Sequence, residues 1–164
     1  MMAPDPQDLR RVMGLFATGV TVLTTRRDEG FHAMTANAFS SLSLEPPLVL
    51  VCIDKKARTH RFLETASCFA VNILGEEQAH LSGHFARSWP EGADMFESVP
   101  YHLGEVGCPL LEECLAYLEC RLVGAHDGGD HTIFVGQVKT ATAAMTGLPL
   151  IFYQGAYSGL RPPT

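Results

Sequence analysis

The sequence predicts a mainly β protein with a few short helices, built around one antiparallel sheet that curls into a barrel. Most apolar segments are short and rich in β-branched residues, which is typical of strands. Short turns separate many of these segments, so strands that follow one another in the chain should pair antiparallel. About seven strands in one small domain would leave exposed edges unless the sheet closes on itself.

Length and composition indicate a single domain that spans residues 1–164, with its core at about residues 9–160. Chains divide into several domains only well above this size. Apolar residues make up 46% of the chain and charged residues 18%, whereas a soluble domain has roughly 25% charged residues. The apolar content excludes a disordered chain, and the low charge suggests that part of the surface is covered.

The charge and the cysteines exclude several classes of protein. A net charge of -6 argues against binding to a nucleic-acid backbone. No apolar run approaches the roughly 20 residues that span a bilayer, and no basic and apolar leader opens the chain. We expect no nucleic-acid or membrane partner and a cytoplasmic location. Five cysteines without a C-x-x-C pair fit reduced, buried thiols better than disulfides or a zinc site.

The first predicted elements are a helix and a hairpin. Asp5 can cap the helix, Pro6 suits its first position, and Gly19 ends it. Its apolar residues share one face: Leu9, Val12, Met13 and Phe16. Residues 20–25 and 31–36 are rich in β-branched residues and flank a charged turn, which predicts a β-hairpin.

The middle of the chain predicts two buried strands and two helices. Residues 48–53 form a continuous apolar run after a Pro-Pro pair, which predicts a strand buried on both faces at the centre of the sheet. A short helix over residues 59–63 follows, and then a second buried strand over residues 69–74. Glu76 and Glu77 favour the start of the next helix.

The remainder of the chain predicts one long irregular segment and three strands. Residues 87–109 contain too many glycines and prolines for a regular element. Residues 115–126 and 132–141 alternate on either side of Asp127-Gly128-Gly129-Asp130, which predicts a long hairpin. Residues 150–153 form a last strand.

Two segments have the composition of binding sites. Residues 35–47 place hydroxyl groups and one carboxamide among small residues, where they can hydrogen-bond a flat polar ligand or form the outer face of a half-exposed strand. Four of the twelve Lys and Arg residues lie within residues 55–61, at the start of a helix. Positive charge, a threonine hydroxyl and free helix N–H groups suit a phosphate. A solvated basic turn is the alternative, but a local charge that opposes the net charge favours the phosphate site.

Other motifs are weaker. His80 and His84 lie one helical turn apart, but no third ligand is evident and we expect no metal. Tyr153 and Tyr157 lie beside glycines, which suits stacking on a ring as well as ordinary packing. Neither phosphate-binding glycine motif occurs, which disfavours a Rossmann fold, and no Gly-x-Ser-x-Gly motif suggests a hydrolase.

Taken together and in order, these segments resemble the short-chain flavin reductase family, the reductase components of two-component flavin-dependent monooxygenases. The resemblance covers about residues 9–160. It rests on residues 16–24, on residues 35–47 with their Pro-Pro ending, and on Gly129-Asp130-His131 in a hairpin. It implies an antiparallel Greek-key split β-barrel that binds FMN or FAD, and a homodimer with flavin near the subunit interface.

The resemblance also implies roles for individual residues. Those expected to line the isoalloxazine ring and the ribityl chain are Thr35, Ala36, Asn37, Ser40 and Ser41. Those expected at or beside the phosphate are Asp54, Lys55, Lys56, Arg58 and Thr59. Phe85 is expected to border the flavin. His131 is expected to contact the nicotinamide nucleotide and is the one catalytic residue implied, and Tyr157 is expected to assist it.

The implied activity is hydride transfer from NADH or NADPH to FMN or FAD. The reduced flavin would then diffuse to a partner monooxygenase, commonly an aromatic hydroxylase. The one obvious basic cluster is already assigned to flavin, which favours NADH over NADPH. Two alternatives use the same barrel, namely a flavin- or haem-binding protein without reductase activity and a pyridoxamine-phosphate oxidase-like enzyme. The Gly129-Asp130-His131 hairpin and the Pro-Pro segment favour the reductase.

Overall fold

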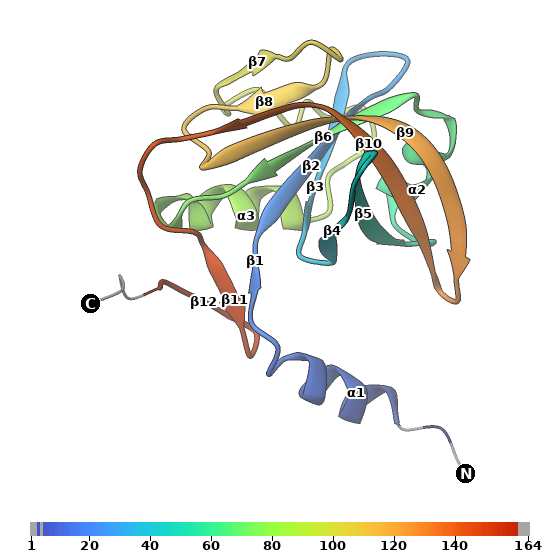
Figure 1. Ribbon diagram of the computed structural model, residues 1–164, viewed down its shortest axis with the longest axis vertical. Coiled ribbons are helices and arrows are strands. Elements are labelled where there is room, and N and C mark those ends of the chain that lie inside the picture. The colour runs from blue at the N-terminus through green and yellow to red at the C-terminus, as the bar shows by residue number, and fades with distance from the viewer. Residues whose placement is uncertain (1–2, 4, 161–164) are drawn as a thin grey trace.

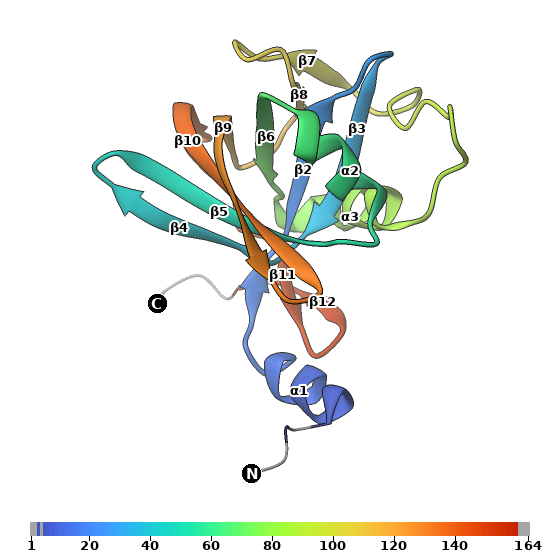
Figure 2. The same ribbon diagram turned by 90° about the vertical axis from the view of Figure 1, so that its right-hand side faces the viewer.

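A computed structural model of the chain describes residue 3 and residues 5–160 (Figure 1). Its main sheet contains β2 (Thr21–Arg26), β3 (Phe31–Ala36), β4 (Phe39–Leu44), β5 (Pro47–Asp54), β6 (Cys68–Ile73), β9 (Ala116–Gly128) and β10 (His131–Ala143). The strands are antiparallel and follow the order β3-β2-β6-β9-β10-β5-β4. The edge strands β3 and β4 are joined by residues 37–38, so the sheet must bend to bring its edges together. Figure 2 shows this twisted sheet from the side. The predicted mainly β, antiparallel fold is confirmed.

Both predicted hairpins are present. β2 pairs with β3 from Thr21 opposite Ala36 to Arg26 opposite Phe31. β9 and β10 pair along most of their length and are longer than the pattern predicted. Near its tip the long hairpin also pairs with β5, which places His131 opposite Asp54. The hairpin therefore carries a predicted functional residue to the carboxyl end of β5.

The prediction that residues 48–53 form the central strand, buried on both faces, is wrong. β5 lies one strand from the edge, between β4 and β10. Its side chains alternate, with Val49, Val51 and Ile53 buried and the residues between them half-buried. The half-buried face is apolar, so the run looked continuous in the sequence. Strand β4, which pairs with the outer edge of β5, was predicted only as one of the two alternatives for residues 35–47.

The described residues include three α-helices: α1 (Pro6–Met13), α2 (Arg58–Thr65) and α3 (Ala79–Ala86). The Asp5 side chain caps α1 as predicted, by accepting a hydrogen bond of 2.7 Å from the N–H of Gln7. The helix ends at Gly14 rather than Gly19. Glu76 and Glu77 lie in a 3₁₀ turn that leads directly into α3. Both predicted central helices are thus confirmed.

Short strands complete the fold; the sequence predicted the one over residues 150–153 and did not indicate the others. β1 (Thr18–Gly19) pairs with β11 (Ile151–Tyr153), which pairs in turn with β12 (Ala156–Ser158). This small sheet explains why α1 ends early, because Thr18 and Gly19 are held in a strand. β7 (Tyr101–Leu103) pairs with β8 (Pro109–Leu111). The expectation of no regular element over residues 87–109 is therefore wrong at its C-terminal end.

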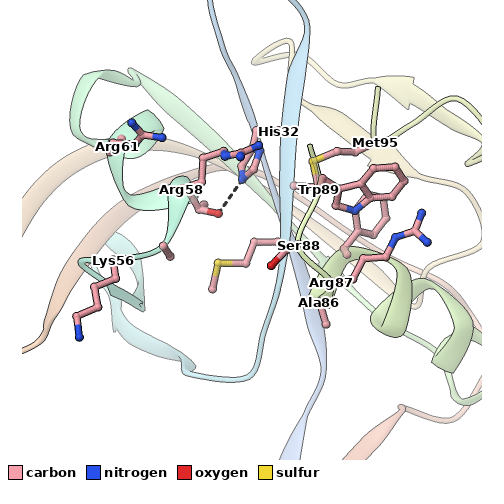
Figure 3. A pocket seen from close by; sticks show the side chains of 14 residues that line it. His32, Lys56, Arg58, Arg61, Ala86, Arg87, Ser88, Trp89 and Met95 are labelled. Carbon is pink, nitrogen blue, oxygen red and sulfur yellow. Dashed lines mark hydrogen bonds between the residues drawn. The ribbon is translucent and has the colours of Figure 1, made fainter. Parts of the chain in front are cut away.

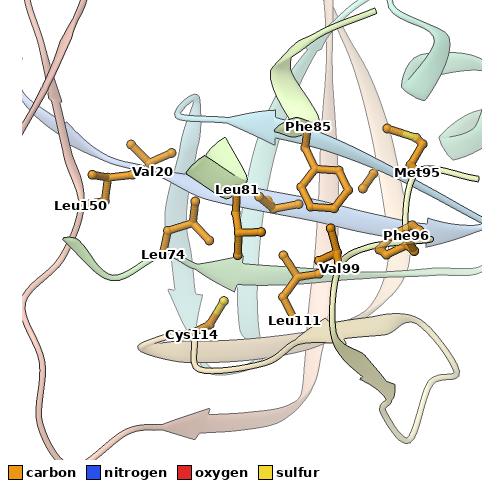
Figure 4. Close-up of a cluster of buried hydrophobic side chains, with 12 residues drawn as sticks. Val20, Leu74, Leu81, Phe85, Met95, Phe96, Val99, Leu111, Cys114 and Leu150 are labelled. Carbon is orange, nitrogen blue, oxygen red and sulfur yellow. The ribbon is translucent and has the colours of Figure 1, made fainter. Parts of the chain in front are cut away.

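The hydrophobic core has two parts. One lies between α3 and the main sheet, where Phe85 packs against Met95 and Phe96 (Figure 4). The other contains Phe69 and Phe134 from the sheet and Leu63 from α2, all fully buried. The two parts hold α2 and α3 against the sheet, and both helices supply residues to the site described below.

Helix α1 projects from the rest of the molecule (Figures 1 and 2). None of its residues is buried. We call the exposed side chains of this region the N-terminal apolar face; they are Leu9, Val12, Met13, Leu15 and Phe16, each 53% to 69% exposed. The apolar face predicted for this helix is thus real, but nothing within the described part of the chain covers it. None of the described helices combines the length and the apolar character needed to cross a membrane.

Candidate functional site

A cavity of about 500 Å³ lies between β3, the start of α2 and the segment that follows α3 (Figure 3). Four of the residues predicted to bind flavin line it: Lys56, Arg58, Thr59 and Phe85. The remaining lining residues are His32, Ala33, Met34, Ala57, Arg61, Ala86, Arg87, Ser88, Trp89 and Met95. We call this space the basic cavity.

The basic cavity is strongly positive. Lys56, Arg58, Arg61 and Arg87 all line it, and none of its lining residues is acidic. Arg87 also stacks on the ring of Trp89, with its guanidinium carbon 3.9 Å from the ring centroid. Unopposed positive charge in a concave site attracts anions. The sequence prediction of a phosphate site over this segment therefore has a matching cavity.

Backbone hydrogen bonds fix the turn that opens the cavity. The carboxylate of Asp54 accepts a hydrogen bond of 2.7 Å from the N–H of Lys56, and its carbonyl accepts one of 2.9 Å from the N–H of Ala57. Ala57 occupies the N-cap of α2 and offers no side-chain cap. The first N–H groups of α2 thus have no capping side chain and remain available to an anion.

His32 forms the inner wall of the cavity and was not predicted. Its ring is buried, lies 4.8 Å from the ring of Phe62, and its Nε2 atom is 2.8 Å from the Thr59 hydroxyl. Burial, with smaller contributions from Arg58 and Arg27, lowers the pKa of His32 from 6.5 to about 4. The ring is therefore neutral at physiological pH and adds no charge to the cavity.

A second cleft, of about 390 Å³, lies where the sheet edges meet. Asn37 and Ser40, both predicted to bind flavin, line it together with Phe16 and Phe39. The Asn37 side chain donates a hydrogen bond of 3.2 Å to the Thr18 hydroxyl. Residues 32–40 therefore pass along both cavities, with His32 to Met34 in the first and Asn37 to Ser40 in the second.

Ser82 on α3 connects two other predicted residues. Its backbone carbonyl accepts a hydrogen bond of 2.7 Å from the Thr35 hydroxyl. Its own hydroxyl lies 2.7 Å from the hydroxyl of Tyr157. Thr35 and Tyr157 are distant in the sequence, yet both are positioned by this one buried serine. No pattern in the sequence indicates this role of Ser82.

Three predicted residues meet outside the basic cavity, at the tip of the long hairpin. Asp54 lies opposite His131, and the Lys55 ammonium group contacts the carboxylate of Asp127 and the carbonyl of Gly129. The Nδ1 atom of His131 lies 2.7 Å from the Asp130 carboxylate. The hydrogen bond from His131 lowers the pKa of Asp130, and Lys55 lowers that of Asp127. Lys55 therefore points to the hairpin, whereas Lys56 lines the edge of the basic cavity and its charge also acts on Asp130.

Two predicted residues lie apart from these groups. Ala36 is buried in the second part of the core, and Ser41 is exposed on β4. Within this single chain the predicted residues thus form neighbouring groups rather than one closed pocket. The main cavity residues that the sequence did not indicate are His32, Arg87 and Trp89. Arg87 and Trp89 lie within residues 87–109, which were expected to be irregular because of their glycines and prolines.

Comparison with known proteins identifies the family. The family model described as "Flavin reductase like domain" matches residues 13–161. An NADH-dependent FAD reductase of Streptomyces globisporus is 45% identical over 163 residues, covering 96% of this chain and 89% of that protein. The reductase component of a 4-nitrophenol 4-monooxygenase/4-nitrocatechol 2-monooxygenase of Rhodococcus opacus is 44% identical over 158 residues, covering 96% of this chain and 83% of that protein.

Solved structures agree with this result. The NADH:FAD oxidoreductase SgcE6 of Streptomyces globisporus C-1027 superposes with a TM-score of 0.93 and 43% identity, covering 100% of this chain and 99% of that one. A second structure of SgcE6 contains NAD and FAD fragments. With its full-length fold match, its basic cavity and its sequence similarity, this chain belongs to the flavin reductase-like family.

Proposed function

We propose that this protein is an NADH-dependent flavin reductase that supplies reduced FAD or FMN to a partner monooxygenase. The observation that carries the proposal is the basic cavity, because four residues assigned to flavin by sequence resemblance line it in a chain of this family. The related proteins named above are reductases, which favours this activity over the haem-binding and amine-oxidising alternatives.

The residues of the basic cavity suit a flavin nucleotide. A flavin phosphate is an anion, and the donors here are the Arg58 guanidinium, the Lys56 ammonium group and the uncapped N–H groups of α2. Phe85 and Met34 add apolar surface to the same cavity. We propose that these groups hold the phosphate end, and that Thr35, Asn37 and the β4 serines face the ring.

His131 is proposed to position the nicotinamide nucleotide. It lies at the hairpin tip, directly across the strands from Asp54, which orders the phosphate-binding turn. Asp130 holds the Nδ1 side of its ring and leaves the Nε2 side free to meet a ligand. The hydroxyl of Tyr157 contacts that of Ser82 on α3. Tyr157 is proposed to assist His131 in binding the nicotinamide nucleotide.

When both nucleotides are bound, they supply the chemistry, which is transfer of a hydride from the nicotinamide ring to the flavin ring. The chain has to bind the two rings in contact and keep water out. No general acid or base is required of it. This explains why the candidate site consists of cations, hydroxyl groups and apolar side chains rather than a pair of catalytic carboxylates.

We further propose that the protein is a homodimer. The N-terminal apolar face is large and contiguous for a soluble chain, and faces of this kind mark protein interfaces. Phe16 belongs to this face and also lines the second cleft. A second copy would therefore bury the apolar helix and close the cleft beside Asn37 and Ser40.

The partner is proposed to be a flavin-dependent monooxygenase, which receives reduced flavin by diffusion. The Rhodococcus opacus relative is named as the reductase component of a monooxygenase for 4-nitrophenol and 4-nitrocatechol. An aromatic hydroxylase is thus the favoured partner class for this protein as well.

The test is NADH oxidation in the presence of free flavin. Purified protein is mixed with NADH and FAD or FMN, and the loss of the near-ultraviolet absorbance of NADH is followed. We expect flavin-dependent oxidation, faster with NADH than with NADPH. An absence of NADH consumption with either flavin would overturn the proposed function.

A further inference from the structure

Cys68 and Cys108 are the two cysteines whose sulfur atoms approach each other within the described part of the chain. Their Sγ atoms lie 3.6 Å apart and share a hydrogen bond. Cys68 begins β6, and Cys108 immediately precedes β8. The flavin site proposed above uses neither residue. A disulfide requires a sulfur separation of about 2.0 Å, so a small movement of the two side chains would suffice to join them.

The two thiols differ in access. Cys68 is half-buried and lines a cleft of about 230 Å³ together with Arg26, Arg27 and Asp28. Cys108 is fully buried behind it. Burial, together with the neighbouring Cys68, raises the pKa of the Cys108 thiol. A small oxidant can therefore reach Cys68 from the cleft, whereas Cys108 is fully buried and does not line the cleft.

The surroundings of Cys68 favour its reaction. Two arginines and one aspartate line the same cleft, and the guanidinium groups of Arg26 and Arg27 can donate hydrogen bonds to the oxygen atoms of a bound peroxide. The cleft has room for a small oxidant such as hydrogen peroxide. The backbone carbonyl of Val106 lies 3.4 Å from the Cys68 sulfur and helps to hold it next to Cys108.

We propose that Cys68 and Cys108 form a reversible disulfide in response to hydrogen peroxide. In the first step the Cys68 sulfur attacks one peroxide oxygen. An S–O bond forms, the O–O bond breaks, and the departing hydroxide takes up a proton to leave as water. The Cys68 sulfur is oxidised by two electrons and becomes a sulfenic acid, while the peroxide is reduced.

In the second step the Cys108 sulfur attacks the Cys68 sulfur. The S–S bond forms, the S–O bond breaks, and the departing hydroxide leaves as water with the Cys108 proton. Together, two thiols and one hydrogen peroxide give one disulfide and two waters. An external dithiol reverses the reaction by thiol–disulfide exchange.

The proposed function would explain why such a site is useful. Free reduced flavin that no monooxygenase consumes passes two electrons to oxygen and yields hydrogen peroxide. The protein would thus be exposed to hydrogen peroxide whenever its reduced flavin reacts with oxygen instead of reaching a monooxygenase. The disulfide would join the start of β6 to the segment before β8, which closes a loop of about forty residues and should stabilise the fold. This explanation rests on the proposed function, whereas the dithiol chemistry does not.

The experiment uses the full-length protein without flavin or NADH, so that its outcome is independent of reductase activity. Protein is treated with stoichiometric hydrogen peroxide, the remaining thiols are blocked with N-ethylmaleimide, and the products are analysed by mass spectrometry. We expect the loss of two hydrogen atoms, two fewer blocked thiols, and one peptide pair joined through Cys68 and Cys108. Dithiothreitol should restore both thiols, and the oxidised protein should melt roughly 5–10 °C higher.

Two variants make the result specific. Cys108→Ser should leave the folded protein with an oxygenated Cys68 and no disulfide. The matched control is Cys52→Ser, because Cys52 is also a half-buried cysteine on a strand of the main sheet; this variant should still form the disulfide. The proposal is overturned if the peroxide-treated protein keeps all five thiols free, if its disulfide joins other cysteines, or if the link forms between two chains.

Discussion

The ring of His32 and the hydroxyl group of Thr59 form a hydrogen bond of 2.8 Å that joins β3 to the first turn of α2. Both side chains are buried, and both line the basic cavity. The contact holds the positively charged end of α2 against the sheet. Burial and the neighbouring arginines favour the neutral form of this histidine, which gives the fold a dependence on pH.

The first prediction concerns that pH dependence. The folded-state pKa of His32 is about 4, below the unfolded value of 6.5, so between these values the unfolded chain binds the extra proton. The neutral His32 ring therefore makes its full contribution to the free energy of unfolding above about pH 6.5, and this contribution is lost as the pH falls toward 4. Between pH 7 and pH 5 the loss should be roughly 2 kcal/mol. His32→Gln should remove this part of the loss, as measured by urea unfolding at several pH values. The prediction is contradicted if the free energy of unfolding falls equally with pH in the parent protein and in His32→Gln.

The second prediction concerns the anion-binding role of the basic cavity. Arg58→Ala removes a guanidinium group that lines it and should weaken FMN binding by about ten-fold to a hundred-fold, because a charge-assisted hydrogen bond contributes about 1.5–3 kcal/mol. Riboflavin, which lacks the phosphate, should bind equally to both proteins. Quenching of flavin fluorescence measures both affinities. Lys139→Ala is the control, since Lys139 is exposed on β10 and bonds only to Gln137 among the described residues. An equal loss for riboflavin would place Arg58 elsewhere than at the phosphate.

The third prediction separates nicotinamide binding from flavin binding. His131→Ala should raise the KM for NADH or lower kcat, while the affinity for flavin stays near the parent value. Asp130→Asn should give a smaller change of the same kind, because it weakens the hydrogen bond that orients the His131 ring. Steady-state rates at varied NADH and a separate flavin titration measure the two effects. Unchanged NADH kinetics in His131→Ala would exclude a role for this side chain.

The fourth prediction concerns the proposed dimer. Val12 is 56% exposed in the N-terminal apolar face, and Val12→Glu should place a charge in the interface and give a monomer by light scattering. Met145 is 99% exposed and lies outside that face, so Met145→Glu should leave the mass unchanged. A parent protein that is itself monomeric would refute the dimer, and a dimeric Val12→Glu would move the interface to another surface.

The sequence predicted the fold class because its strongest signals are local. The hairpin over residues 20–36 and the long hairpin over residues 115–141 each consist of alternating strands around a turn. The order of strands in a sheet depends on contacts between distant parts of the chain, so it could not be predicted in the same way. The half-buried face of β5 is also apolar, which made this strand look buried on both faces. Strand β4 could be predicted only as one of two alternatives, because its serines suit a ligand-binding segment as well as the polar face of a half-exposed strand.

The candidate site was predicted in part for the same reason. Lys56, Arg58 and Thr59 lie close together in the sequence, so their common cavity could be foreseen. Ser82, which positions Thr35 and Tyr157, joins three segments that are far apart, and no spacing rule reveals such a residue. Trp89 belonged to a segment rich in glycine and proline, and the irregular backbone obscured the fact that it forms a cavity wall.

The last prediction concerns the packing of the long hairpin against the core. A Cβ atom at Gly136 would lie 2.4 Å from the Phe69 ring and 2.9 Å from the Cβ of Cys120, and both of these side chains are fully buried. The neighbours have no space to move into, so Gly136→Ala should cost about 1–3 kcal/mol in the free energy of unfolding. Gly83 on α3 is the matched control, because its added Cβ would meet nothing within 4 Å. Gly83→Ala should raise stability by about 0.5–1 kcal/mol through better helix propensity. Urea unfolding measures both variants, and a neutral Gly136→Ala would show that β10 and β6 lie further apart than described.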